Sequence, residues 1–113
     1  MKFYTNDSKA ILKAISGSAD NLKEITANTT DAAVEKHVPV YESNDGKICV
    51  KVGSVEHPMQ EVHYIEWIAV KTNKGFYVKY LSPEESPSAC FTVENETVEA
   101  VYAYCNLHGL WKS

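Results

Sequence analysis

The stretch of residues 64–80, YIEWIAVKTNKGFYVKY, decides the fold class of this chain. Its first half, Tyr64 to Val70, is rich in aromatic and β-branched residues, which are favoured in β-strands. The polar residues 72–74 have turn composition, and Gly75 to Tyr80 is a second run of the strand type. Two such runs around a short turn predict neighbouring antiparallel strands of one meander.

Three further runs of the same kind lie on either side of this stretch. Lys47 to Val52 precedes it and alternates polar with apolar residues. Ala89 to Val93 and Val98 to Tyr104 follow a loop, residues 82–88, that contains two prolines. Many short strands separated by turns, with little helix, are typical of packed sheets. The sequence therefore predicts an all-β protein with a β-sandwich architecture.

The composition changes near Asp31, and we expect the chain to divide there. Residues 1–30 are mostly small and polar, and within them Ser8 to Ile15 could form a short helix or a weak hairpin. Asn28 to Asp31 has turn composition. Because 113 residues suffice for one ordinary domain, we predict a short N-terminal extension, 1–30, followed by one domain, 31–113.

Composition and charge disfavour several classes of function. The chain has 44% hydrophobic residues, 23% charged residues and a formal net charge of -4, without the basic excess of nucleic-acid-binding proteins. No apolar run approaches the roughly 18 residues that cross a bilayer, and polar residues soon follow Met1. We therefore expect no nucleic-acid partner, no membrane association and a cytoplasmic location.

The cysteines favour a reducing compartment. Three cysteines cannot all pair within one chain, and their spacing lacks the density of a secreted disulfide framework. We therefore expect free thiolates that are available to a metal. Cys49 and Cys90 lie in strand-like runs, where a free cysteine usually behaves as a small buried hydrophobic residue, and we assign them no function.

The remaining cysteine and all four histidines have positions that suit a shared metal site. Cys105 and His108 are three residues apart, so one turn can direct a thiolate and an imidazole at one ion. His57 and His63 flank the start of the strand near Tyr64, and a loop between them can bring their side chains together. His37 lies just upstream of an extended segment and can reach the same point from another edge.

Four imidazoles and one thiolate are one ligand too many for the tetrahedral site of structural zinc. Imidazole suits iron, copper, nickel or zinc, and a single thiolate donates electron density that favours a redox role. The set therefore favours iron with one open position. Because a metal with one anionic ligand keeps a net positive charge, a small anion such as superoxide would be attracted there.

Four segments of the chain resemble the iron-site motifs of superoxide reductases, the family that includes desulfoferrodoxin and neelaredoxin. They occur in the family's order between about Asp31 and Lys112, and every ligand type is present. The segments are Glu35-Lys36-His37-Val38-Pro39-Val40, His57-Pro58-Met59, His63-Tyr64-Ile65-Glu66-Trp67-Ile68 and Cys105-Asn106-Leu107-His108-Gly109-Leu110-Trp111.

This resemblance implies an immunoglobulin-like β-sandwich and a mononuclear, square-pyramidal iron. The implied ligands are four equatorial imidazoles and one axial thiolate, from His37, His57, His63, His108 and Cys105. The implied activity is the one-electron reduction of superoxide to hydrogen peroxide, with electrons from an external donor such as rubredoxin. The resemblance also places Glu35 and Lys36 on a mobile loop over the open face. There the carboxylate can occupy the sixth position of ferric iron and the ammonium attracts superoxide.

The first residues also resemble the opening of the small desulforedoxin-like domain found in longer members of the family. The four cysteines that bind iron in that domain are missing, so residues 1–30 are expected to be a remnant without a metal site. Asn6 and Lys9 stand where the first cysteine pair would fall, and Gly17 and Ser18 stand near the second. We expect the remnant to serve packing or dimer contact, with a homo-oligomer, a dimer in particular, as the favoured assembly.

Two other functions use the same residues. A structural or storage module would treat the fifth ligand as adventitious, and a one-electron transfer protein would never bind an oxygen species. Saturated coordination favours either alternative, whereas five ligands and an open position favour the enzyme. Colour separates zinc from iron, because a ferric site with a thiolate ligand absorbs visible light.

Overall fold

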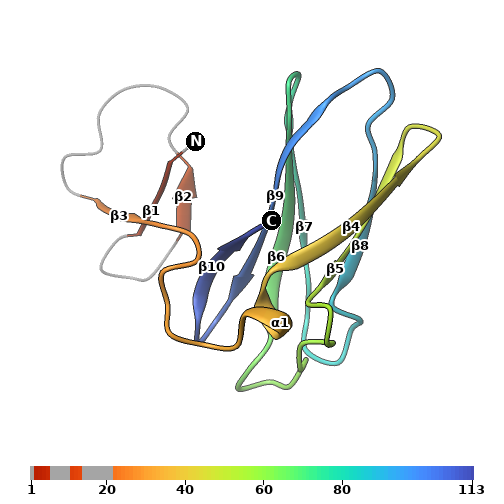
Figure 1. Cartoon of the computed structure of the whole chain (residues 1–113). Coiled ribbons are helices and arrows are strands. Elements are labelled where there is room, and N and C mark those ends of the chain that lie inside the picture. Colours follow the sequence, from red (N-terminus) through yellow and green to blue (C-terminus); the bar gives the residue numbers. More distant parts are fainter. Residues whose placement is uncertain (1, 6–10, 14–21) are drawn as a thin grey trace.

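The computed structural model describes residues 2–5, 11–13 and 22–113, and the regular secondary structure of these residues is almost entirely β-strand (Figure 1). The predicted all-β, immunoglobulin-like sandwich is confirmed. In chain order the described elements are β1 Phe3–Thr5, β2 Ile11–Lys13, β3 Lys23–Ile25, α1 Val34–His37, β4 Pro39–Asn44, β5 Lys47–Val52, β6 Ile65–Thr72, β7 Phe76–Tyr80, β8 Ser88–Thr92, β9 Val98–Cys105 and β10 Gly109–Lys112.

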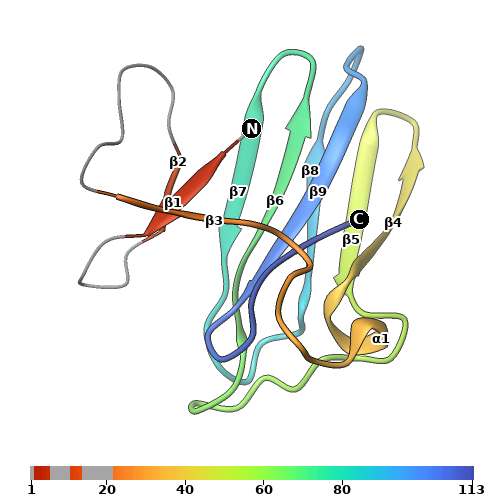
Figure 2. The same ribbon diagram turned by 60° about the vertical axis from the view of Figure 1, so that its left-hand side comes forward.

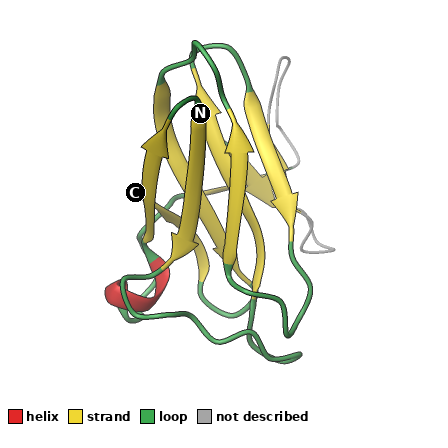
Figure 3. Ribbon diagram, turned by 90° about the vertical axis from the view of Figure 1, so that its right-hand side faces the viewer, coloured by secondary structure: helices red, strands yellow, loops and turns green. Residues whose placement is uncertain are grey.

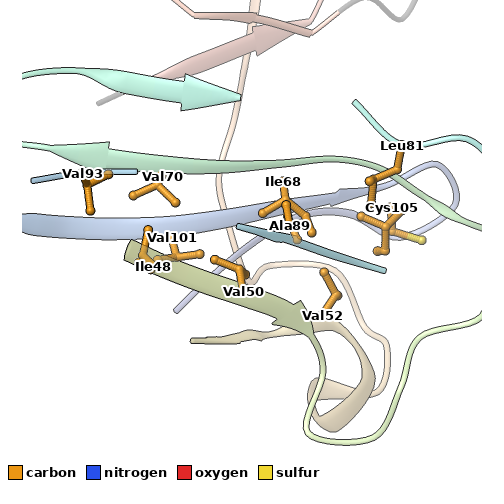
Figure 4. Close-up of a cluster of buried hydrophobic side chains, with 12 residues drawn as sticks. Ile48, Val50, Val52, Ile68, Val70, Leu81, Ala89, Val93, Val101 and Cys105 are labelled. Atoms are coloured by element: carbon orange, nitrogen blue, oxygen red, sulfur yellow. The ribbon is translucent and has the colours of Figure 1, made fainter. Parts of the chain in front are cut away.

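Two antiparallel sheets form the sandwich. One has the strand order β10-β9-β6-β7 and the other has the order β4-β5-β8, and Figures 2 and 3 show the two layers from different sides. Alternate residues of each strand point to the space between the layers. These inward residues are mostly β-branched and fully buried, and ten of the cluster are labelled in Figure 4; they include Ile48, Val50, Val52, Ile68, Val70 and Val101.

The other face of the four-stranded sheet is covered by a small N-terminal sheet with the order β2-β1-β3. Phe3 of β1 is buried there, with its ring 5.9 Å from the ring of Trp67 and 4.9 Å from that of Tyr102. This second apolar cluster also contains Ala69, Ala100 and Leu110. The four-stranded sheet therefore has an apolar core on each face.

Asn28 connects the N-terminal segment to the edge of this sheet. Its side chain donates to the carbonyl of Lys112 at 3.0 Å and accepts the backbone N–H of Lys112 at 2.8 Å. Its own N–H donates to the carbonyl of Leu110 at 3.0 Å. The turn composition of residues 28–31 thus marks the point where the chain crosses β10.

Several expectations from the sequence need correction or lie outside the described residues. Within Ser8 to Ile15 the structure describes one strand, β2, and the rest of that run falls in the residues that are not described. The helix α1 and the strands β1, β3, β4 and β10 are additions to the five runs that the strand pattern assigned. Among the described residues, no helix is long and apolar enough to cross a membrane.

The expectation that Cys49 and Cys90 are free and buried is wrong. The two residues are partners in the register of β5 and β8, and their sulfur atoms form a disulfide. Cys90 is exposed and Cys49 is half-buried. The physical reason is the alternation of β5: Ile48 and Val50 occupy the core, so Cys49 points to the outer face of the sheet.

Candidate metal centre

The short helix α1 positions His37. Its last residue places the imidazole in the interior, where the side chain is 2% exposed and the ring stacks on Trp111 at 4.8 Å. The Nδ1 atom donates to the carbonyl of Ala33 at 2.7 Å. This bond fixes the tautomer and leaves Nε2 as the free lone pair that faces the neighbouring histidines.

Gly53, the residue after β5, allows α1 to lie this close. Its φ of 86° is in the left-handed region, and a Cβ at this position would meet the carbonyl oxygen of Val55 and come within 2.8 Å of the carbonyl oxygens of Glu35 and Lys36. The backbone N–H of Val55 donates to the carbonyl of Glu35 at 2.9 Å, which ties α1 to this loop. The position of His37 therefore depends on a glycine in another segment.

His57 and His63 come from the long connection between β5 and β6. His57 is 1% exposed, and its Nδ1 donates to the carbonyl of Pro58 at 2.7 Å, so Nε2 again faces inward. Gln60 and His63 exchange two backbone hydrogen bonds of 2.9 Å, which close a small loop directly before β6. The sequence interpretation of a loop that brings these two histidines together agrees with this arrangement.

The turn between β9 and β10 supplies Cys105 and His108. Cys105 is fully buried at the end of β9, and its Sγ lies 3.9 Å from Nδ1 of His108. Gly109, with a φ of 79°, starts β10 opposite Cys105. Asn106 joins this turn to the other loop, because its side chain accepts the Tyr64 N–H at 2.9 Å and donates to the Val62 carbonyl at 3.1 Å.

The four imidazole rings surround a common centre. Neighbouring ring centroids are 4.7 Å apart for His37 and His57, 4.7 Å for His57 and His63, 5.0 Å for His63 and His108, and 4.9 Å for His108 and His37. The diagonal from His37 to His63 is 6.4 Å. These distances describe a near-square of rings.

The possible ligand atoms converge within this square. Nε2 of His37 lies 3.2 Å from Nε2 of His57 and 3.1 Å from Nδ1 of His108. One donor atom each from His37, His63, Cys105 and His108 lies within 4.8 Å of all the others. The structure thus brings together every histidine and the cysteine named from the sequence, with His57 joined to the group through His37.

The environment of three of these imidazoles, those of His37, His57 and His63, favours the neutral form, which can bind a cation. Burial lowers the pKa of His57 to about 4 and also lowers the pKa values of His37 and His63. Burial raises the pKa of the Cys105 thiol, so a cation is needed to favour the thiolate.

One buried nitrogen atom, Nε2 of His63, could bind a cation. Nε2 of His63 is buried and has no hydrogen-bond partner among the described residues. An unsatisfied buried polar atom costs about 1–3 kcal/mol, whereas coordination to a metal would satisfy its lone pair. The donor set therefore fits a metal ion that accepts both nitrogen and sulfur.

Glu35 and Lys36 lie beside this group on α1, and both are exposed. The positive charge of Lys36 contributes to the lowered pKa values of His37 and His63, and Glu35 has the opposite effect on His37. Sequence reasoning missed the supporting roles of Gly53, Asn106 and Trp111. The only signal for Asn106 and Trp111 is their place within the Cys105 to Trp111 segment.

Comparisons with known proteins agree on one family. A family model described as Desulfoferrodoxin matches residues 29–113. A desulfoferrodoxin homolog of Archaeoglobus fulgidus is 52% identical over 92 residues, which cover 81% of this chain and 73% of that protein. A superoxide reductase of Thermococcus kodakarensis is 32% identical over 106 residues, covering 78% of this chain and 92% of that protein.

Comparison with solved structures gives matches to superoxide reductases as well. The superoxide reductase from Treponema pallidum matches with a TM-score of 0.84 and 36% identity, and the match covers 100% of this chain and 99% of that chain. The superoxide reductase from Giardia intestinalis matches with a TM-score of 0.60 and 31% identity over 70% of this chain and 95% of that chain. The fold is thus that of superoxide reductases, and the described residues contain a histidine–cysteine group that could hold a metal ion.

Proposed function

Because this chain belongs to the desulfoferrodoxin family, we propose that it is a superoxide reductase, an oxidoreductase that converts superoxide to hydrogen peroxide with one electron. The observation that carries the proposal is the donor set: a near-square of four imidazoles with one buried thiol beside it. Such a set suits a redox-active iron better than a closed tetrahedral zinc site.

The proposed iron ligands are Nε2 of three histidines, Nδ1 of His108 and Sγ of Cys105. The three Nε2 ligands come from His37, His57 and His63. When bound, the iron would supply one electron to superoxide and regain it from a donor protein. The chain contributes the rigid positions of the donors, because Ala33 and Pro58 carbonyls fix two of the rings through their other nitrogens.

Lys36 and Glu35 are the proposed residues that act on the substrate side. An exposed ammonium whose field reaches His37 and His63 raises the local concentration of a small anion. It can also donate charge-assisted hydrogen bonds to a reduced product. Glu35, on the same helical turn, is the proposed carboxylate that binds the metal when substrate is absent.

Further proposals concern the whole protein. We propose an external one-electron donor such as rubredoxin, a cytoplasmic location and a homodimer. We also propose that residues 1–30 are a desulforedoxin-like remnant without a metal site and that 31–113 form the iron-binding domain. The separate β2-β1-β3 sheet supports this division, because none of its described strands pairs with a strand of the sandwich.

A superoxide-consumption assay that also measures oxygen tests the proposal. The purified chain is loaded with iron and its metal content is measured. It is then exposed to superoxide in the presence of a reductant. A reductase consumes superoxide and forms peroxide without releasing oxygen, whereas a dismutase forms both. An iron-loaded chain that takes up electrons but leaves superoxide unchanged would instead identify an electron-transfer protein.

A further inference from the structure

The outer face of the sheet β4-β5-β8 holds two cysteines that the metal centre does not use. Cys49 and Cys90 are direct partners in the register of β5 and β8, and they are bonded as a disulfide. Their Cα atoms are 4.1 Å apart, near the spacing of antiparallel partners whose side chains stand side by side. The pair is therefore built into the sheet by strand register.

This face is open to a reacting partner. Cys90 is exposed and Cys49 is half-buried. The N-terminal sheet covers the opposite sheet of the sandwich, and the described elements leave the outer face of β4-β5-β8 uncovered (Figures 1 and 2). Both cysteines line a hollow of about 630 Å³ that also includes Glu42 and Lys51. A second molecule can thus reach the more exposed sulfur, that of Cys90.

The charges around Cys49 favour its thiolate. Lys47 and Lys51 lie two residues before and after it on β5, so their side chains leave the same face of the sheet. Both lysines are exposed. The strands β4, β5 and β8 carry one carboxylate at their outward positions. It belongs to Glu42, the partner of Cys49 on β4. Two ammonium groups against one carboxylate leave a net positive surrounding, which stabilises a leaving thiolate.

We propose that Cys49 and Cys90 form a second, metal-free redox site that exchanges two electrons with a dithiol protein of the Cys-x-x-Cys type. A thiolate of the reductant attacks Sγ of Cys90 and forms a mixed disulfide. Cys49 leaves as a thiolate and takes up a proton. The second thiol of the reductant then attacks the mixed disulfide and departs as an internal disulfide. Cys90 takes up the second proton. The reductant loses two electrons and two protons, and the cysteine pair gains them.

The fold can carry out this exchange without unfolding. β5 is the central strand of its sheet and pairs with β4 over residues 47–52 and with β8 over residues 47–51. Its inward side chains, such as Ile48 and Val50, remain buried in the core whatever the state of the sulfurs. The inference does not depend on iron chemistry, because Cys105 lies in a different sheet.

Thiol counting on the full-length, iron-loaded chain tests this site. The chain is incubated with reduced thioredoxin, which its reductase regenerates with NADPH, and thiols are then alkylated and located by peptide mass spectrometry. We expect Cys49 and Cys90 to become labelled, with NADPH consumption that matches one disulfide per chain. The variant Cys90→Ser should consume none and keep the visible spectrum of the iron.

Two results would overturn the proposal: a pair that stays bonded until the chain is denatured, or a pair already present as free thiols after isolation in air. The role of the lysines is tested separately by the rate of exchange. The double variant Lys47→Ala/Lys51→Ala should exchange roughly threefold more slowly, because a less stabilised thiolate leaves more slowly. Lys74→Ala/Lys79→Ala, at and beside β7, is the matched control and should exchange at the unmodified rate. Equal rates in all three chains would contradict the assignment of Cys49 as leaving group.

Discussion

At the scale of single residues, the candidate metal centre is defined by which nitrogen each histidine keeps free. His37 and His57 donate Nδ1 to carbonyls within four residues of themselves, so each directs Nε2 to the centre. His108 is different, because its Nδ1 faces Cys105 and His37. Local backbone geometry therefore determines which ring nitrogen of each of these histidines remains free.

Replacing Cys105 tests the thiolate ligand. Cys105→Ser should fold, since the side chains differ little in volume, but it should lose the visible absorption of the iron-loaded protein and most superoxide reduction. A neutral hydroxyl cannot replace the charge that a thiolate donates to a metal. Absorption spectra and iron analysis of both chains measure the effect. Cys90→Ser is the control that should keep the spectrum, and unchanged turnover in Cys105→Ser would exclude the ligand role.

Lys36 separates electrostatic attraction from metal binding. Lys36→Ala should slow the capture of superoxide while iron content and the resting spectrum stay the same. Because ions screen charges over about 10 Å at 0.1 M salt, the capture rate of the unmodified chain should fall as salt rises, and the variant should depend on salt less. Rapid mixing with superoxide at several ionic strengths measures this. The exposed Lys79→Ala serves as control, and an identical salt slope for Lys36→Ala would reject the steering role.

The buried histidines predict how the metal-free chain responds to acid. The pKa of His57 is about 4 when folded and 6.5 in its ordinary state, and the pKa values of His37 and His63 shift in the same direction. Between about pH 6.5 and 4 the unfolded chain therefore binds more protons, so the free energy of unfolding should decrease as pH falls through this window. Urea unfolding at a series of pH values measures it. His57→Gln should have a shallower slope, and a flat profile would contradict the buried neutral state.

At the scale of secondary structure, the five strands from β5 to β9 could be predicted, whereas helix α1 and several other described strands could not. Each of the five runs assigned from the sequence overlaps one of β5 to β9, because aromatic and β-branched residues pack well on half-buried sheets. The four-residue helix α1 lacks a helical period, and its conformation depends on the loop at Gly53. Strand β10 has only four residues and forms by pairing with β9.

The pairing of Cys49 with Cys90 illustrates the same limit. The alternation of Lys47 to Val52 predicts which residues of β5 face inward, and it could have placed Cys49 outside. It does not predict that β5 pairs with β8, or that the register of this pair aligns Cys49 with Cys90, 41 positions further along the chain. Strand register between distant segments is fixed by the whole core.

Gly53 gives the prediction that belongs to this scale. Gly53→Ala should displace α1 and weaken metal binding, since the added Cβ meets two carbonyl oxygens of α1 and a left-handed φ costs a non-glycine residue about 1–2 kcal/mol. Iron retention during dialysis against a chelator measures the displacement. Gly46→Ala is matched, because Gly46 also has a positive φ but lies in the β4–β5 turn. Both variants should lose stability, and equal iron retention in the two would show that α1 does not depend on Gly53.

At the scale of the whole molecule, the segments that carry the candidate ligands gather at one end of the sandwich. α1, the β5–β6 connection and the β9–β10 turn all lie at the lower end in Figure 1, and Figure 3 shows the same grouping from the side. The centre is thus built on loops held by a rigid core. The N-terminal sheet packs instead on the outer face of the four-stranded sheet.

This arrangement predicts that the N-terminal sheet can be loosened without loss of the metal centre. Phe3→Ala removes the buried ring that contacts Trp67 and Tyr102, and replacing a buried Phe by Ala costs about 3–5 kcal/mol. We expect this loss to destabilise the packing of the N-terminal sheet, strands β1, β2 and β3, against the four-stranded sheet. Trp67 fluorescence should then shift to the red, and hydrogen exchange in the three strands should become faster. Iron content and absorption should persist, because the core between the sandwich sheets contains none of the changed contacts.

The comparison variant is Ile68→Ala, on the opposite face of β6. Its cost of about 2–5 kcal/mol should lower both the midpoint of global unfolding and the retention of iron. If Phe3→Ala released the iron as Ile68→Ala does, the two apolar clusters would be one cooperative unit, and the proposed division at residue 30 would be wrong.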